Sequence, residues 1–169
     1  MRAVGAFWCH YNPNFGDALN PELFRRLGGL DIEYASAEEA SVAGIGSILD
    51  KFLAEVPSSA GEVAPLKVFS SGFDAAPANG RLLKRNLTCY AVRGRKTAAA
   101  IRALDPGIKT GVLGDGGLLL KFIIGGHVDP KHRVGIVPHY VERDDPAFVR
   151  LTEGIDGAVI LDPREGVES

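Results

Sequence analysis

Amide, carboxylate and glycine residues follow the first apolar run of the sequence. Residues 4–8 read Val-Gly-Ala-Phe-Trp, and Asn14, Gly16 and Asp17 come soon after them. Such side chains can orient the hydroxyl groups of a ligand, and a glycine lets the ligand approach the backbone. The same side chains can instead build a turn and cap a helix. One loop can do both, so we treat these three residues as candidate substrate-binding residues.

Glycine and serine are paired after two later apolar runs, in Gly46-Ser47 and in Ser71-Gly72. This pairing is expected where backbone amides approach a ligand or where a helix begins. Neither segment matches a Walker loop or a complete dinucleotide-binding fingerprint. Asp115, which lies between glycines, could cap a helix or bind a hydroxyl group of an acceptor. All five residues are candidates for substrate binding.

The segment around Arg93 and Arg95 is the most informative one. Residues 81–102 contain seven Lys or Arg and no acidic residue, and residues 61–126 carry a charge of +6 although the whole chain carries −2. Free amides at a helix start, together with two guanidinium groups, can bind a phosphate or a carboxylate. The alternative is an exposed basic turn. Nucleic acid is not expected as a partner, because only Tyr90 interleaves with these charges.

A histidine, His139, directly follows the apolar run 134–137. At the end of a buried strand, its imidazole could act in acid/base chemistry or bind an anion. We find no spacing of His, Cys or carboxylate residues that is typical of a metal site. Cys9 and Cys89 also fit no redox motif, which favours a reducing, cytoplasmic compartment.

The elements that must position these residues alternate between strand and helix. The first helix contains Leu19, Leu23 and Leu27, with Asp17 or Asn20 as its cap and Pro21 in its first turn. The second helix covers 95–104, and weaker helical patterns cover 47–53, 81–86 and 146–151. Strands are expected at 4–8, 41–45, 67–69, 88–92, 112–113, 134–137 and 158–161.

This alternation predicts an α/β fold with a Rossmann-like parallel sheet, in which ligands bind at the carboxyl ends of the strands. We expect one complete Rossmann-like domain at 1–126, a linker at 127–132 and the start of a second domain at 133–169. Apolar residues make up 46% and charged residues 24% of the chain, which excludes a disordered chain or a membrane bundle. The longest apolar stretch, 111–126, is too short to cross a bilayer.

Six segments, in this order, resemble the polysaccharide pyruvyl transferase family of exopolysaccharide biosynthesis. Together they span nearly the whole chain. They are Asn14-Phe15-Gly16-Asp17, Gly44-Ile45-Gly46-Ser47-Ile48-Leu49, Ser71-Gly72-Phe73, Val92-Arg93-Gly94 with Thr97, Leu113-Gly114-Asp115, and Gly135-Ile136-Val137-Pro138-His139-Tyr140.

The resemblance implies two Rossmann-like halves facing each other, as in GT-B glycosyltransferases, with the second half truncated here. It implies transfer of a pyruvyl group from phosphoenolpyruvate to hydroxyls of a saccharide, without metal or cofactor. The saccharide could be lipid-linked and met peripherally, without an integral membrane segment. The Ser-x-His-Gly segment of the family's second half has no counterpart, so we expect the chain to be a fragment.

On this basis we hypothesise that Arg93 and Arg95 bind the donor anions. His139 would bind an anion or act as acid or base, and Asn14 and Asp17 would orient the acceptor, so that His139 and Asp17 are the candidate catalytic residues. Two alternatives stay open. The chain could belong to a sugar-nucleotide glycosyltransferase of GT-B type, or it could be an inactive, truncated module that binds an anion.

Overall fold

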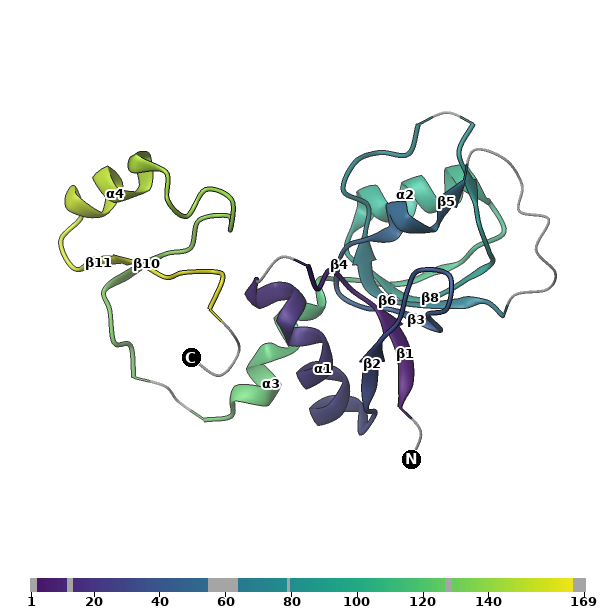
Figure 1. Ribbon diagram of the computed structural model, residues 1–169, viewed down its shortest axis with the longest axis horizontal. Helices are drawn as coiled ribbons and strands as arrows, with labels where there is room; N and C mark the ends of the chain where they lie inside the picture. Colours follow the sequence, from purple (N-terminus) through teal and green to yellow (C-terminus); the bar gives the residue numbers. More distant parts are fainter. Residues whose placement is uncertain (1–2, 12–13, 55–63, 79, 127–128, 166–169) are drawn as a thin grey trace.

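In a computed structural model of the chain, the described residues are 3–11, 14–54, 64–78, 80–126 and 129–165. Figure 1 shows their helices and strands. The strands are β1 (Val4–Phe7), β2 (Ile32–Tyr34), β3 (Val42–Ala43), β4 (Gly46–Ser47), β5 (Leu53–Ala54), β6 (Leu66–Gly72), β7 (Leu82–Leu83), β8 (Leu87–Val92), β9 (Thr110–Leu113), β10 (Val134–Ile136) and β11 (Ala158–Ile160). The α-helices are α1 (Phe15–Gly28), α2 (Arg95–Leu104), α3 (Lys121–Ile124) and α4 (Pro146–Glu153), and the 3₁₀ helices are η1 (Leu49–Phe52) and η2 (Gly116–Leu120).

The central sheet has seven strands in the order β2-β1-β3-β6-β8-β9, with β4 also paired to β6. Every pair in it is parallel. The predicted α/β class with a parallel, Rossmann-like sheet is therefore confirmed. The chain passes from β1 outward to β2 and then returns past β1 to β3, so the strand order reverses between β1 and β3. Open α/β sheets bind their ligands at such a reversal.

Helix α1 begins earlier than the sequence predicts. Asn14 is its N-cap and accepts a hydrogen bond from the Asp17 amide at 3.0 Å, so the expected cap at Asp17 or Asn20 is wrong. Pro21 consequently lies inside the helix and not in its first turn. A proline has no N–H for the carbonyl four residues before it. Here the Asn20 side-chain amide donates to that Asp17 carbonyl at 3.0 Å instead.

Helix α2 has the bounds that the sequence predicts. Ala98 and Ile101 are buried against the sheet, and Asp105 ends the helix. Both residues belong to the larger core cluster, together with Leu49 and Phe52 of η1. A smaller cluster joins α1 to η2 and α3. Helix α1 connects β1 to β2, and α2 connects β8 to β9, which lies in the opposite direction across the sheet. Because crossovers between parallel strands are right-handed, the two helices lie on opposite faces of the sheet, as Figure 1 shows.

Two of the weaker helical predictions are wrong. The segment 81–86 contains strand β7, which pairs antiparallel with β5. The segment 47–53 is divided among β4, η1 and β5. Both segments carry short apolar patterns that suit helix and strand equally, and pairing with a distant segment decides between the two. Strand β2, next to β1, was not expected.

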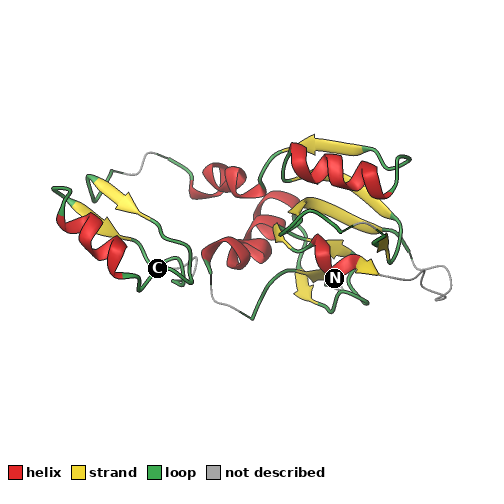
Figure 2. Cartoon of the chain, turned by 90° about the horizontal axis from the view of Figure 1, so that it is seen from above, coloured by secondary structure: helices red, strands yellow, loops and turns green. Residues whose placement is uncertain are grey.

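The elements β10, α4 and β11 form a separate unit. β10 and β11 pair in parallel with each other, and α4 packs against β11. Figures 1 and 2 show this unit apart from the central sheet, with α1 and α3 between them along the molecule. The helix predicted at 146–151 is confirmed as α4. The domain limits at 126 and 133 stay a prediction.

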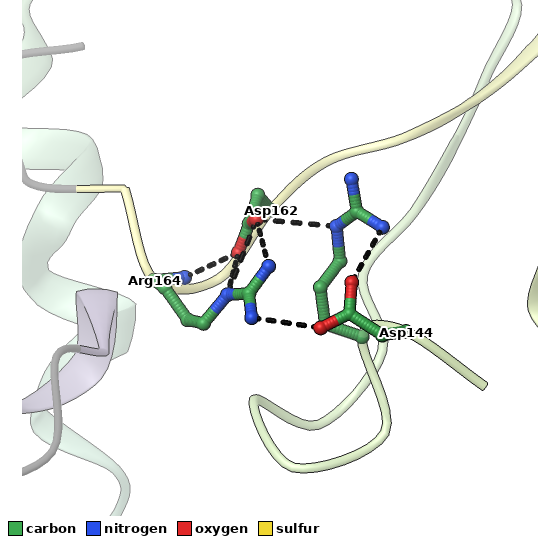
Figure 3. A network of polar contacts seen from close by, with 4 residues as sticks. Asp144, Asp162 and Arg164 are labelled. Atoms are coloured by element: carbon green, nitrogen blue, oxygen red, sulfur yellow. Dashed lines mark hydrogen bonds and ion pairs between the residues drawn. The ribbon is translucent and has the colours of Figure 1, made fainter.

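Four charged side chains form hydrogen bonds that stabilise the loop after β11. Asp162 accepts hydrogen bonds from Arg164 and, at 3.1 Å, from Arg143. Asp144 accepts from the same two guanidinium groups, so the contacts in Figure 3 form a closed ring. Between Asp162 and Arg164, the Pro163 carbonyl accepts a hydrogen bond of 2.7 Å from the Phe15 amide at the start of α1. This ring of charged side chains therefore lies beside the contact between the two units.

Candidate functional site

The loops that follow β1 and β3 meet at the reversal of the strand order. Together with residues from five other segments they surround a cleft of about 910 Å³. The position of this cleft agrees with the prediction that ligands bind at the carboxyl ends of the strands. The predicted site residues that line it are Asn14, Gly16, Asp17, Gly46, Ser47, Arg93, Asp115 and His139.

Asn14 and Asp17 form a paired unit on one wall of the cleft. The Asn14 side chain accepts from the Asp17 amide and donates to the Asp17 carboxylate. Burial raises the pKa of Asp17, although the hydrogen bonds from Asn14 and from the Cys9 backbone act against this rise. Gly46 lies close by with φ of 137°, and a Cβ there would lie 3.0 Å from the Asp17 carboxylate. The two loops thus enclose a partly buried carboxyl group.

Asn20 is a positioning residue that the sequence reasoning missed. It is fully buried, and its amide oxygen accepts from the Ile45 amide at 2.6 Å while its amide nitrogen donates to the Ile45 carbonyl at 3.1 Å. A Cβ on Gly44 would lie 2.1 Å from that oxygen. Asn20 therefore ties the loop after β3 to α1. The sequence contains one indication of this role, because Asn20 is a polar residue on the face of α1 that also carries Leu19 and Leu23.

Arg93 reaches across the sheet edge from the end of β8. Its guanidinium donates to the Ser47 hydroxyl and, at 2.8 Å, to the Phe73 carbonyl. A Cβ on Gly72 would lie 2.6 Å from the Arg93 Nε atom, so this glycine leaves room for the side chain. Among the described residues, these two bonds use only two of the ~5 N–H donors of a guanidinium. Arg93 is held in place with donors left for a ligand.

A second cavity, of about 550 Å³, lies at the start of α2. Arg93 lines both cavities, whereas Arg95 lines only the second one, together with Lys96. The two cavities differ in charge. The second has three cationic residues and one carboxylate, Asp74. The cleft has two cationic residues, Lys51 and Arg93, against four carboxylates, which are Asp17, Asp50, Asp74 and Asp115.

Ser71 does not reach either cavity. It is fully buried, and its hydroxyl contacts the carbonyls of Gly44 and, at 3.1 Å, Ala43. The expectation that Ser71 binds substrate is corrected on this point, because the hydroxyl links β6 to β3. A register shift before Ser71, with φ of 58° at Ser70, accounts for its inward direction.

Asp115 and His139 lie on the remaining walls of the cleft. The Asp115 carboxylate caps η2 by accepting from the Gly117 amide at 2.8 Å, while its side chain stays exposed. His139 comes from the loop after β10, and its exposed ring lies 4.4 Å from that of Tyr140. The cleft therefore brings His139 to the same space as Asp17, although the two residues belong to different units.

Neither a metal centre nor a membrane span is present in the described part of the chain. No group of three or more His, Cys, Asp or Glu residues there could hold a metal ion. None of the helices among those residues is long and apolar enough to cross a membrane.

The chain is an α/β protein with a parallel central sheet and a cleft at the reversal of its strand order. In comparisons with known proteins, neither a family model nor a solved structure matches the chain. An uncharacterized protein of Acanthamoeba polyphaga mimivirus is 30% identical over 84 residues, which cover 48% of this chain and 29% of that protein. The alignment spans less than a third of this relative, and it assigns no activity to the chain.

Proposed function

We propose that the chain is part of a pyruvyl transferase of GT-B type that moves a pyruvyl group from phosphoenolpyruvate to hydroxyls of a saccharide. This proposal rests on one observation. Two cavities of different charge lie next to each other, and Arg93 lines both of them. Phosphoenolpyruvate bears a phosphate and a carboxylate, which suit the cationic cavity. A neutral saccharide offers hydroxyl donors, which suit the carboxylates of the cleft.

The reaction forms a ketal and releases phosphate. Two hydroxyl oxygens of the acceptor bond to the central carbon of the enolpyruvyl group, and the bond from that carbon to the phosphate oxygen breaks. The methylene carbon gains one proton and becomes a methyl group. The acceptor loses two protons, of which one balances this methyl proton and the other leaves with the phosphate. The step needs no oxidant or reductant.

The walls of the cleft offer groups for these proton transfers. Asp17 has a raised pKa because of burial, and it lies beside the Asn14 amide, so it suits the role of base for an acceptor hydroxyl. His139, on the opposite unit, is exposed to the cleft and suits the exchange of the second proton. Arg93 would hold the donor carboxylate between the two cavities.

Binding of phosphoenolpyruvate to the chain tests this assignment. By calorimetry, we expect Arg93→Ala to weaken binding by at least about tenfold, because a hydrogen bond to a charged group is worth ~1.5–3 kcal/mol. The matched control is Arg102→Ala, since Arg102 belongs to the same basic segment but is exposed in the last turn of α2. The Arg102→Ala variant should bind phosphoenolpyruvate with unchanged affinity.

Nucleotide sugars serve as the competing ligands in the same experiment. Binding of a nucleotide sugar without binding of phosphoenolpyruvate would favour a glycosyltransferase. Binding of neither would favour an inactive module. Equal losses of affinity in the Arg93 and Arg102 variants would remove Arg93 from the donor site.

A further inference from the structure

The start of helix α2 has no cap from a side chain. Gly94 is its N-cap residue, and no side chain accepts from the first turn. Within the described residues, the amides of Arg95, Lys96 and Thr97 donate no hydrogen bond, whereas the Ala98 amide donates to the Gly94 carbonyl at 3.0 Å. Helix N-termini leave their first amides unsatisfied, and these are usually paired with side chains, water or ligands. Three donors are therefore directed at the space before α2.

Thr97 adds a fourth donor to this space. Only 6% of its surface is exposed, and it lines the cavity of about 550 Å³ at the start of the helix. Its hydroxyl makes no hydrogen bond to any other described residue. No buried side-chain oxygen or nitrogen among the described residues lacks a hydrogen-bond partner, so the oxygen of the Thr97 hydroxyl keeps accessible surface although the rest of the residue is buried. Because Thr97 lines the cavity, its hydroxyl can donate to an acceptor that enters there.

The charged residues that line the cavity indicate that this acceptor is an anion. Arg93, Arg95 and Lys96 line it, against the single carboxylate of Asp74. The positive end of the helix dipole disfavours cations in the first turn by about 0.3–1 kcal/mol each. Arg95 and Lys96 occupy that turn nevertheless. An anion between them and the amides would turn this repulsion into attraction.

We propose that this cavity is a phosphate monoester site, in which the three amides and the Thr97 hydroxyl bind the phosphate oxygens. A phosphate has three terminal oxygens in a tetrahedral arrangement and can accept from all four donors, whereas a planar carboxylate presents only two oxygens. The phosphate end of the donor lies at α2, and its carboxylate end lies at Arg93, toward the cleft. The identity of the donor rests on the proposed function, but the binding of phosphate does not.

Titration with inorganic phosphate tests this site on the chain itself. We expect Thr97→Val to weaken phosphate binding about tenfold, since it removes one hydrogen bond to a charged ligand and keeps the shape of the side chain. Thr97→Ser keeps the hydroxyl and should bind within about twofold of the original chain. Pyruvate, which carries only a carboxylate, should bind equally to all three proteins. Thermal melting verifies that each variant is folded.

Three outcomes would overturn the phosphate site: no binding of inorganic phosphate to the original chain, equal phosphate affinity in the Val and Ser variants, or an equal loss of pyruvate binding in the Val variant. The proposed function fails separately. If phosphate binds as expected but phosphoenolpyruvate does not, the site stands without the pyruvyl transfer. If phosphoenolpyruvate binding depends on Arg93 but not on Thr97, the transfer stands without this site.

Discussion

At the scale of the residue, Asp17 in the first turn of α1 combines a hydrogen-bonded position in the cleft with a raised pKa. It accepts from Asn14 and lies in the cleft, yet burial raises its pKa. A carboxyl group with a raised pKa holds its proton to a higher pH than usual, which is typical of carboxylates that exchange protons with a substrate. A residue that only stabilised α1 would be expected to have a lowered pKa.

The variant Asp17→Asn separates these two roles. Because the folded pKa is raised, the folded chain binds more protons than the unfolded one above about pH 3.9, so the charged carboxyl destabilises the fold as pH rises from there. The variant lacks this loss, and its melting temperature relative to the original should rise between about pH 4 and neutral pH. Any pyruvyl transfer should fall about 100-fold. Transfer at the original rate would leave Asp17 with a structural role only.

At the scale of the element, the loop after β3 depends on α1. Asn20 replaces the hydrogen bond that Pro21 cannot give to the Asp17 carbonyl, and it also pairs with both polar backbone groups of Ile45. One buried side chain therefore satisfies the interruption in α1 and fixes the loop that carries Gly46. The wall of the cleft formed by this loop is positioned by the helix and not by the short strand β3.

The variant Asn20→Ala should lower the free energy of unfolding by about 3 kcal/mol. It leaves an amide and two carbonyls without their partner, and each buried group without a partner costs ~1–3 kcal/mol. Urea denaturation gives this value. Asn86→Ala, at an exposed position, is the control and should change stability by less than about 0.5 kcal/mol. A change as small as that of the control would show that the loop is held by other contacts.

At the scale of the whole molecule, the cleft is closed by a unit that does not share the central sheet. Its His139 reaches the cleft because β10, α4 and β11 are placed beside α1. The Pro163 carbonyl contacts the Phe15 amide, and the ring of charged groups in Figure 3 fixes the loop around Pro163. Hydrogen bonds from Arg164, followed by the charges of Arg164 and Arg143, hold the pKa of Asp162 far below its ordinary value.

Amide hydrogen exchange at Phe15 reports on this contact. Asp162→Asn should speed exchange there, because the loop around Pro163 loses its charged partner. Asp156→Asn, which breaks the exposed pair with Arg133 in the same unit, should not. Since the pKa of Asp162 is lowered in the folded chain, its stabilisation is present above about pH 3.9 and is lost as pH falls further. If the Phe15 amide exchanges at the same rate in both variants at one pH, the ring of charged side chains does not stabilise the contact between Pro163 and Phe15.

Local patterns in the sequence determined the class of the fold and several of its elements. The apolar runs predicted strands β1, β6, β8, β10 and β11, and the amphipathic pattern with Asp105-Pro106 predicted α2 with its observed bounds. The glycine and polar residues after these runs predicted eight of the 22 residues that line the cleft. These features follow from the backbone preferences and apolar spacing of neighbouring residues, which a sequence displays directly.

Only the tertiary structure decided which side chains face the cavities. Ser71 turns inward after the irregularity at Ser70, and Thr97 is buried where it lines the cavity at the start of α2, although nothing in its neighbours marks it. The division into a cationic cavity and a carboxylate-lined cleft depends on Arg93, which reaches residues far from it in the sequence. The direction of a side chain is set by packing against distant segments, and local spacing holds no information on it.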